Sequence, residues 1–190
     1  MNTLIDVLGA MVIGSMLMLM MITFQYQLRD TADAAIYMTG MVEEMQKASS
    51  KLNSIIALAG VGYTPTTTVA IADTNRLKFY TKWDYQNDRI SSNPHTLEIK
   101  LATTATSLGR SLMITQDGVL LNDLGYLLWV DGLRFIYYTK TNTLTTAPAQ
   151  VRSAELWLTF RHNAPKAGQK PLRTRLQQRC YFMNSYLQGA

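Results

Sequence analysis

The sequence predicts an α+β fold, with one long N-terminal helix packed on an antiparallel β-sheet domain. Three observations lead to this prediction. Residues 7–28 carry no charge and are almost wholly apolar. Residues 29–59 repeat apolar side chains at steps of three and four, which places them on one face of a helix. From residue 66 onward, apolar and polar residues alternate, as they do along a strand with one buried face.

The apolar segment is long enough to cross a membrane. At a rise of about 1.5 Å per residue, residues 7–28 form a helix of about 33 Å, which spans a hydrocarbon core. Asp6 is the charged residue that precedes this segment. The segment is longer than the apolar part of a usual signal peptide and follows no basic residue, so we expect it to be retained. We therefore assign residues 1–28 to a transmembrane half of the helix.

The helix is predicted to continue as an amphipathic half over residues 29–60. No proline interrupts the chain before Pro65, and Gly60 and Gly62 are the kind of residue that commonly follows a helix C-terminus. The apolar residues of this half form one stripe, which we expect to pack on the sheet. The stripe consists of Met38, Met41, Met45, Ala48, Leu52, Ile55 and Ala59.

The remaining residues, 66–190, are predicted to form the antiparallel sheet domain. Alternating runs mark the expected strands, which are 77–83, 97–101, 110–121, 133–138, 154–160 and 173–183. Asp, Asn, Gly and Pro gather between these runs and predict turns or loops. The predicted loops are 84–93, 117–118, 131–132, 141–148 and 163–171. Such strands laid against the apolar stripe of the helix would bury both apolar faces.

The net charge of +5 is unevenly placed along the chain. Residues 151–190 contain seven of the Arg and Lys residues, and Glu155 is the acidic residue among them. A basic face can meet nucleic acid, anionic lipid or an acidic partner subunit. A solvated edge hairpin whose basic side chains guard against aggregation is the preferred interpretation. Cys180 lies in an alternating run and is predicted to be a small buried apolar side chain.

The N-terminal motif and the order of elements resemble the type IV pilin superfamily, particularly the larger minor pseudopilins and minor pilins of the J and W types. The segment Thr3-Leu4-Ile5-Asp6 is similar to the Thr-Leu-Ile-Glu start of that family and places Asp6 where the family has an acid. Four later segments follow the order and spacing of the J/W-type sheet domain. They are RLKFYTKWDYQND (76–88), VDGLRFIYYTKTN (130–142), VRSAELWLTFR (151–161) and PLRTRLQQRC (171–180).

This resemblance implies a structural subunit of a type IV pilus-like or type II secretion-like filament, assembled through its hydrophobic N-terminal helix. Residues 1–28 would then form the filament core. Asp6 would pair with the free N-terminal amine of a neighbouring subunit and set the axial register. The alternative role for Asp6 is to cap the start of the helix and face headgroup water. Gly9 and Gly14 would ease unwinding or close approach between helices.

The same resemblance implies a location and a set of partners. We expect a single-pass protein of the bacterial inner membrane with its head domain outside the cytoplasm, and an extracellular or periplasmic filament as the assembled state. The expected partners are other pilin-like subunits, through the N-terminal helix, and membrane lipid before assembly. Nucleic acid is not expected. A minor subunit that primes or caps the tip is preferred to a repeating subunit, and a membrane-anchored accessory or binding protein that does not assemble is the alternative from another class.

The sequence contains no catalytic arrangement or cofactor motif that we can identify, and we predict no enzyme and no cofactor. His95 and His162 lack the spacing of paired metal ligands on a helix. Asp84, Asn87 and Asp88 offer oxygen ligands for Ca²⁺, although a plain loop is the preferred interpretation. The aromatic residues of the predicted strands are interpreted as core or cross-strand pairs and not as a platform for bases or sugars. They are Tyr80, Trp83, Trp129, Tyr137, Tyr138 and Trp157.

Overall fold

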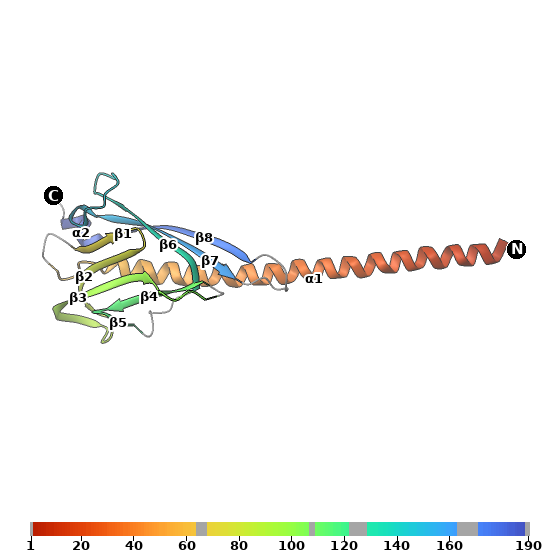
Figure 1. Cartoon of the computed structure of the whole chain (residues 1–190), viewed down its shortest axis with the longest axis horizontal. Helices are drawn as coiled ribbons and strands as arrows, with labels where there is room; N and C mark the ends of the chain where they lie inside the picture. Colours follow the sequence, from red (N-terminus) through yellow and green to blue (C-terminus); the bar gives the residue numbers. More distant parts are fainter. Residues whose placement is uncertain (1, 64–67, 107–108, 122–128, 163–170, 189–190) are drawn as a thin grey trace. The chain divides into compact units, whose positions relative to one another are not determined.

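The computed structural model describes residues 2–63, 68–106, 109–121, 129–162 and 171–188 (Figure 1). The chain consists of two compact units, Met1–Met41 and Val42–Ala190. Helix α1, Asn2–Ala57, supplies the first unit and continues into the second. The predicted long helix is therefore present as one uninterrupted element.

Helix α1 ends three residues earlier than the predicted boundary at residue 60, because the chain turns at its glycines. Gly60 and Gly62 adopt φ values of 76° and 65°, which side-chain-bearing residues rarely adopt. The Gly60 N–H donates to the carbonyl of Tyr80 at 2.8 Å. A Cβ at residue 60 would lie 2.9 Å from Thr68 Cγ2. This turn leads the chain from the helix to the sheet.

The second unit contains an eight-stranded antiparallel sheet in the order β1-β2-β3-β4-β6-β7-β8, with β5 paired to β4 (Figure 1). The strands are β1 (Val69–Asp73), β2 (Arg76–Asp84), β3 (Arg89–Leu101), β4 (Arg110–Gln116), β5 (Val119–Leu120), β6 (Trp129–Tyr138), β7 (Ser153–His162) and β8 (Leu172–Tyr181). A short 3-10 helix covers Pro148–Gln150, and helix α2 covers Met183–Gln188.

Several predicted boundaries are wrong. Strand β1 was not predicted. Strand β3 begins at Arg89, inside the predicted loop 84–93, because residues 85–88 suffice for the turn and Asp88 adopts a φ of 50° there. Residues 110–121, predicted as strand with a turn at 117–118, form two strands, β4 and β5, and the predicted turn is confirmed at Asp117 and Gly118, both with positive φ. The last predicted strand stops at Tyr181, two residues before helix α2 begins. Most of the predicted loop 163–171 lies outside the described residues.

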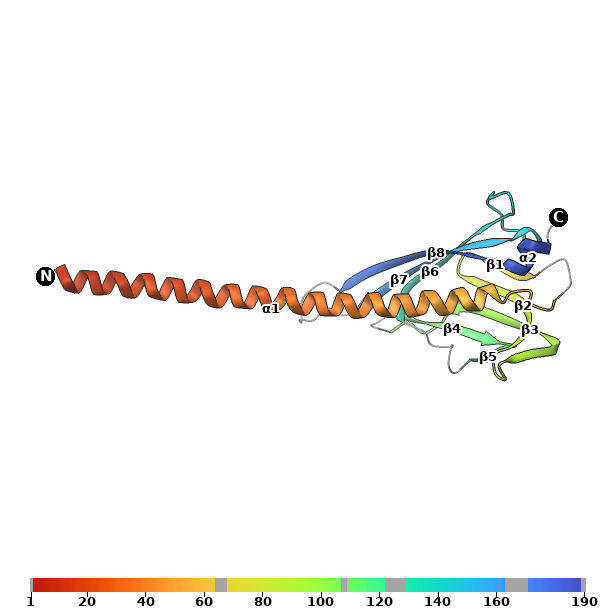
Figure 2. The same ribbon diagram turned by 180° about the vertical axis from the view of Figure 1, so that it is seen from behind.

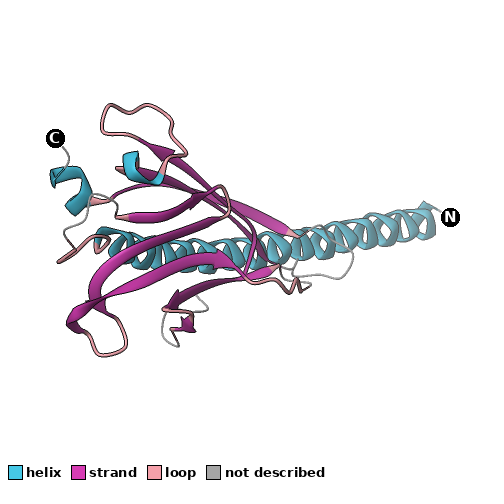
Figure 3. Ribbon diagram, turned by 60° about the vertical axis from the view of Figure 1, so that its left-hand side comes forward, coloured by secondary structure: helices cyan, strands magenta, loops and turns pink. Residues whose placement is uncertain are grey.

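The core of the second unit forms where residues 42–57 of α1 lie along one face of the sheet (Figure 2, Figure 3). Leu52, Ile55 and Ile56 are at most 1% exposed. They share the core with side chains from most of the strands and with Phe182. Burial of these apolar faces on each other holds helix and sheet together, at about 25 cal/mol for each Å² removed from water.

Strand β6 makes the link between the two halves of the sheet. Among the described residues it pairs with β4 through Arg110↔Val130 and Ser111↔Trp129. Farther along, the edge of β6 that faces away from β7 meets other parts of the chain. The Phe135 N–H donates to the Thr74 carbonyl at 2.6 Å, and the Tyr137 carbonyl accepts from the Thr145 N–H at 3.0 Å.

Candidate functional site

The first candidate site is the apolar surface of α1 between Asp6 and Arg29. Its apolar side chains are exposed around the whole helix, from Val7 at 59% to Leu28 at 54%. This helix is long and apolar enough to cross a membrane, and none of its most apolar stretch is buried in the structure. A continuous exposed apolar surface of this kind is typical of a membrane-anchoring helix or of a helix that packs against other apolar helices.

Two hydroxyl side chains inside this segment, Ser15 and Thr23, are hydrogen-bonded to the helix itself. The Ser15 hydroxyl donates to the Val12 carbonyl and the Thr23 hydroxyl donates to the Leu19 carbonyl, both at 2.8 Å. Hydroxyls bonded to their own helix lower the cost of placing these residues in an apolar medium. These two hydroxyls are therefore compatible with an apolar environment.

The predicted assembly residues lie in the first turns of α1. Thr3, Leu4, Ile5 and Asp6 are exposed, and Asp6 has no ion-pair partner among the described residues. A Cβ added at Gly9 or Gly14 would meet nothing within 4 Å. In the part of the chain that the structure describes these residues are exposed, and their assembly role stays a prediction.

The predicted helix–sheet packing residues differ in burial. Leu52 and Ile55 are fully buried, and Met45 packs partly against the core. Met41 is 5% exposed, whereas Met38 is 54% exposed. The spacing pattern did not include Ile56, which is also fully buried. The sequence signal that could have predicted the burial of Ile56 is its position next to Ile55, which widens the apolar stripe of the helix.

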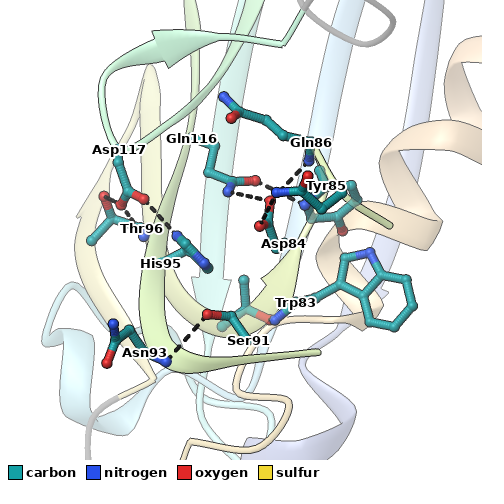
Figure 4. A network of polar contacts seen from close by, with 12 residues as sticks. Trp83, Asp84, Tyr85, Gln86, Ser91, Asn93, His95, Thr96, Gln116 and Asp117 are labelled. Atoms are coloured by element: carbon teal, nitrogen blue, oxygen red, sulfur yellow. Dashed lines mark hydrogen bonds and ion pairs between the residues drawn. The ribbon is translucent and has the colours of Figure 1, made fainter. Parts of the chain in front are cut away.

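The Asp84–Asp88 segment, for which a plain loop was preferred to a calcium site, forms a turn at the end of β2 (Figure 4). Asp84 Oδ1 accepts from the Gln86 N–H at 3.0 Å and from Gln116 Nε2 at 2.9 Å, and Oδ2 accepts from Asn87 Nδ2 at 2.7 Å. The hydrogen bonds from Asn87 and Gln116 lower the pKa of Asp84 to about 2. Donors thus occupy both oxygens, which is the arrangement of an Asx turn. The described residues contain no cluster of three or more His, Cys, Asp or Glu suited to a metal.

His95 belongs to a second polar contact, beside the β4–β5 turn (Figure 4). Its Nδ1 lies 2.7 Å from Asp117 Oδ2, and Asp117 Oδ1 accepts from the Thr96 N–H at 2.7 Å. Burial opposes ionisation, but the hydrogen bonds from Thr96 and His95 leave the pKa of Asp117 lowered. His95 therefore ties a turn to strand β3. The side chain of His162 lies outside the description.

A row of arginines covers the sheet face that points away from α1, on β6, β7 and β8. Arg175 stacks over Trp157, with its Cζ 5.5 Å from the ring centroid, and Arg179 stacks over Tyr138 at 4.4 Å. Cation–π contacts of this kind fix the guanidinium planes on the surface. Tyr138 and Trp157 are thus on the outer face under arginines and are not core residues, whereas Tyr137 is 4% exposed.

Acidic and polar side chains hold this arginine face in place. Asp131 bridges Arg173 at 3.1 Å and Arg161 at 3.8 Å. Glu155 accepts hydrogen bonds from the Tyr138 hydroxyl and from Gln177, and the bond from Tyr138 is the chief reason why the pKa of Glu155 is lowered. The sequence indicated a basic C-terminal region, but not that its arginines align.

No protein-family model and no curated protein matches this sequence. The structure is similar to that of a type IV-like pilin from Thermus thermophilus, with a TM-score of 0.53, 9% sequence identity, and coverage of 76% of this chain and 97% of that chain. The chain therefore has a type IV pilin-like α+β fold, in which a long N-terminal helix packs on an eight-stranded antiparallel sheet. The predicted fold class is confirmed.

Proposed function

We propose that this chain is a structural subunit of a type IV pilus-like or type II secretion-like filament, anchored in the bacterial inner membrane before assembly. The observation that carries the proposal is the row of exposed apolar side chains along helix residues 4–28, on a chain with a pilin-like fold. Lipid would cover this surface before assembly and the helices of other pilin-like subunits would cover it afterwards. The head domain would lie outside the cytoplasm.

Asp6 is proposed to set the axial register of the filament. A carboxylate in a bundle of apolar helices needs a cationic partner, because the low dielectric makes an unpaired charge costly. A partner on a neighbouring subunit, its N-terminal amine, would make correct stacking the arrangement of lowest free energy. Gly9 and Gly14, with open space around them, would let neighbouring helices approach closely.

The experiment replaces Asp6 by Ala in the native host. It then measures the amount of this protein in two fractions, the membranes and the sheared filaments. We expect Asp6→Ala to abolish incorporation into filaments and to leave membrane insertion intact. Glu44→Ala is the matched control, since Glu44 is an exposed carboxylate on the same helix. Normal assembly of Asp6→Ala would contradict the register role. Normal function after replacement of residues 7–28 by an unrelated apolar helix would favour a non-assembling anchored accessory protein.

Within this class we propose a minor subunit that primes or caps the filament tip. The support is the likeness of the sheet-domain segments to minor pilins and pseudopilins of the J and W types. Quantitative mass spectrometry of purified filaments distinguishes the two roles. A few copies per filament, independent of filament length, are expected for a tip subunit, whereas copies in proportion to length would identify a repeating subunit.

A further inference from the structure

We infer that the free edge of β8 is a docking site for an extended acidic segment of a partner protein, which adds to the sheet as a further strand. The inference deepens the proposed function and rests on it for the identity of the partner as another filament subunit. Three features of the described residues carry it. They are the unpaired backbone of β8, the arginines that alternate along it, and the charge that this face leaves uncompensated.

The orientation of the β8 backbone follows from hydrogen bonds made two strands away. The Phe135 N–H donates to the Thr74 carbonyl, and the Tyr137 carbonyl accepts from the Thr145 N–H. The backbone N–H and carbonyl groups of the odd-numbered residues of β6 therefore point away from β7, in the plane of the sheet. Phe135 is opposite Leu156 in β7, and the two form a pair without mutual backbone hydrogen bonds. The backbone groups of Leu156 and of the other even-numbered residues of β7 therefore point toward β8.

The same alternation then fixes β8. Leu156 pairs with Gln178, so the backbone groups of the even-numbered residues of β8 hydrogen-bond to β7. The backbone N–H and carbonyl groups of the odd-numbered residues point to the outer edge of the sheet. Within the part of the chain that the structure describes, no backbone partner occupies this outer edge. Strand β8 is thus a ten-residue edge strand with a regular row of free N–H and carbonyl groups.

The residues with free backbone groups also include arginines, of which Arg173 and Arg175 are exposed and Arg179 is half-buried. Arg173, Arg175 and Arg179 are odd-numbered, and their side chains lie on the outer face of the sheet, over Trp157 and Tyr138 or beside Asp131. In an added strand, the residues opposite Arg173 and Arg175 would be two positions apart and about 6.7 Å from each other. Asp or Glu at alternate positions of an extended segment would meet both arginines at once.

The charge of the outer face favours an acidic partner over a second copy of this chain. Arg161 and Arg173 are directly opposite each other in the sheet and share the carboxylate of Asp131, which leaves excess positive charge. Two copies of β8 placed edge to edge would bring arginines together, and like charges on paired strands destabilise them. The opposite edge, β1, has only five residues and one carboxylate, Asp73, so it offers no matching acidic strand.

The experiment measures binding of a fluorescent ten-residue peptide of alternating Thr and Glu to the full chain in detergent micelles, by fluorescence anisotropy. Two peptides serve as controls: one has the same composition with all Glu residues in one block, and the other is N-methylated at every second residue. We expect only the alternating, unmethylated peptide to bind, and its binding to protect the amides of Arg173, Arg175, Gln177 and Arg179 from hydrogen exchange.

Variants then test the charge match. Arg173→Glu with Arg175→Glu should weaken binding of the alternating peptide by about tenfold or more, since both cross-strand pairs become repulsive. Arg134→Glu, an exposed change on β6 of the same face, should alter binding less than about twofold.

Four results would overturn the inference. They are absence of binding, equal binding of the block or methylated peptide, unprotected edge amides, and equal binding of a single-stranded oligonucleotide of the same charge. The last result would indicate a general polyanion surface. Peptide binding is measured on unassembled protein, so its outcome is independent of filament formation. If the chain forms filaments but does not bind the peptide, this inference alone is contradicted. If the chain binds the peptide but forms no filaments, the proposed function alone is contradicted.

Discussion

Asp84 and Gln116, 32 residues apart in sequence, are joined by a buried hydrogen bond of 2.9 Å from Gln116 Nε2 to Asp84 Oδ1. Strand β3 lies between the strands that carry them, so the contact reaches across a neighbouring strand. Gln116 also accepts the Tyr85 N–H at 2.9 Å through Oε1. One glutamine side chain therefore fixes the turn between β2 and β3 to strand β4.

The first prediction concerns the stability that Asp84 supplies. Asp84→Asn places a side-chain N–H₂ group among amide donors, so buried donors lose their acceptor. We expect a loss of about 1–3 kcal/mol in the free energy of unfolding. Asp88→Asn is the control, because Asp88 is exposed and Asn tolerates the left-handed φ of 50° at that position. Chemical denaturation of the two variants at neutral pH checks the difference.

The second prediction is the pH dependence of the same group. Hydrogen bonds from Asn87 and Gln116 lower the pKa of Asp84 to about 2, from 3.8. The stabilisation is therefore fully present above pH 3.8 and is lost as the pH falls through about 2, because the unfolded chain then binds the proton more tightly. Unfolding free energies between pH 5 and pH 2 should fall more steeply for the natural chain than for Asp84→Asn. Parallel curves would show that Asp84 does not contribute.

The third prediction compares two residues on α1. Leu52 is 0% exposed and Met38 is 54% exposed. Leu52→Ala should lower the free energy of unfolding by about 2–5 kcal/mol, because it removes buried methyl groups and leaves a cavity. Met38→Ala should change it by less than about 0.5 kcal/mol. Denaturation followed by tryptophan fluorescence measures both, and similar losses for the two variants would contradict the described packing of α1.

The fourth prediction concerns the chain's single cysteine. Cys180 is 1% exposed, and burial raises the pKa of its thiol to about 11. Because the thiolate is the reactive form, modification by a disulfide reagent at pH 8 should be at least about a hundredfold slower in the folded protein than in urea. Rapid labelling of the folded chain would show that strand β8 opens readily at this position. The predicted burial of Cys180 is itself confirmed by the structure.

The fifth prediction tests the junction between the two halves of the sheet. Gly109 has a φ of 116°, and a Cβ at that residue would lie 2.6 Å from the Val130 carbonyl oxygen. Gly109→Ala should therefore destabilise the sheet by about 2 kcal/mol or more, since backbone must move and the φ is strained. Gly132→Ala, where a Cβ would meet nothing within 4 Å, is the matched control. Equal thermal midpoints for the two variants would contradict this geometry.

The features that the sequence predicted well are those set by spacing along the chain. The uncharged run after Asp6 and the three- and four-residue steps through Leu52 and Ile55 define one long helix. The alternation around Phe79, Leu156 and Leu158 defines strands with one buried face. These signals are local, because the periods of helix and strand follow from the backbone geometry of consecutive residues.

The features that only the tertiary structure decided depend on which strands lie side by side. Strand β1 has only a weak alternation of apolar and polar residues, and its backbone is held in the strand conformation by pairing with β2. The hydrogen bond between Asp84 and Gln116 and the shared carboxylate between Arg161 and Arg173 require the order and register of the sheet. A one-residue change of register would reverse every side chain of a strand, and spacing within one strand does not specify its partner. The sequence by itself therefore determined the helix, the apolar segment and the strand faces, whereas the sheet order decided which charges meet and which edge stays free.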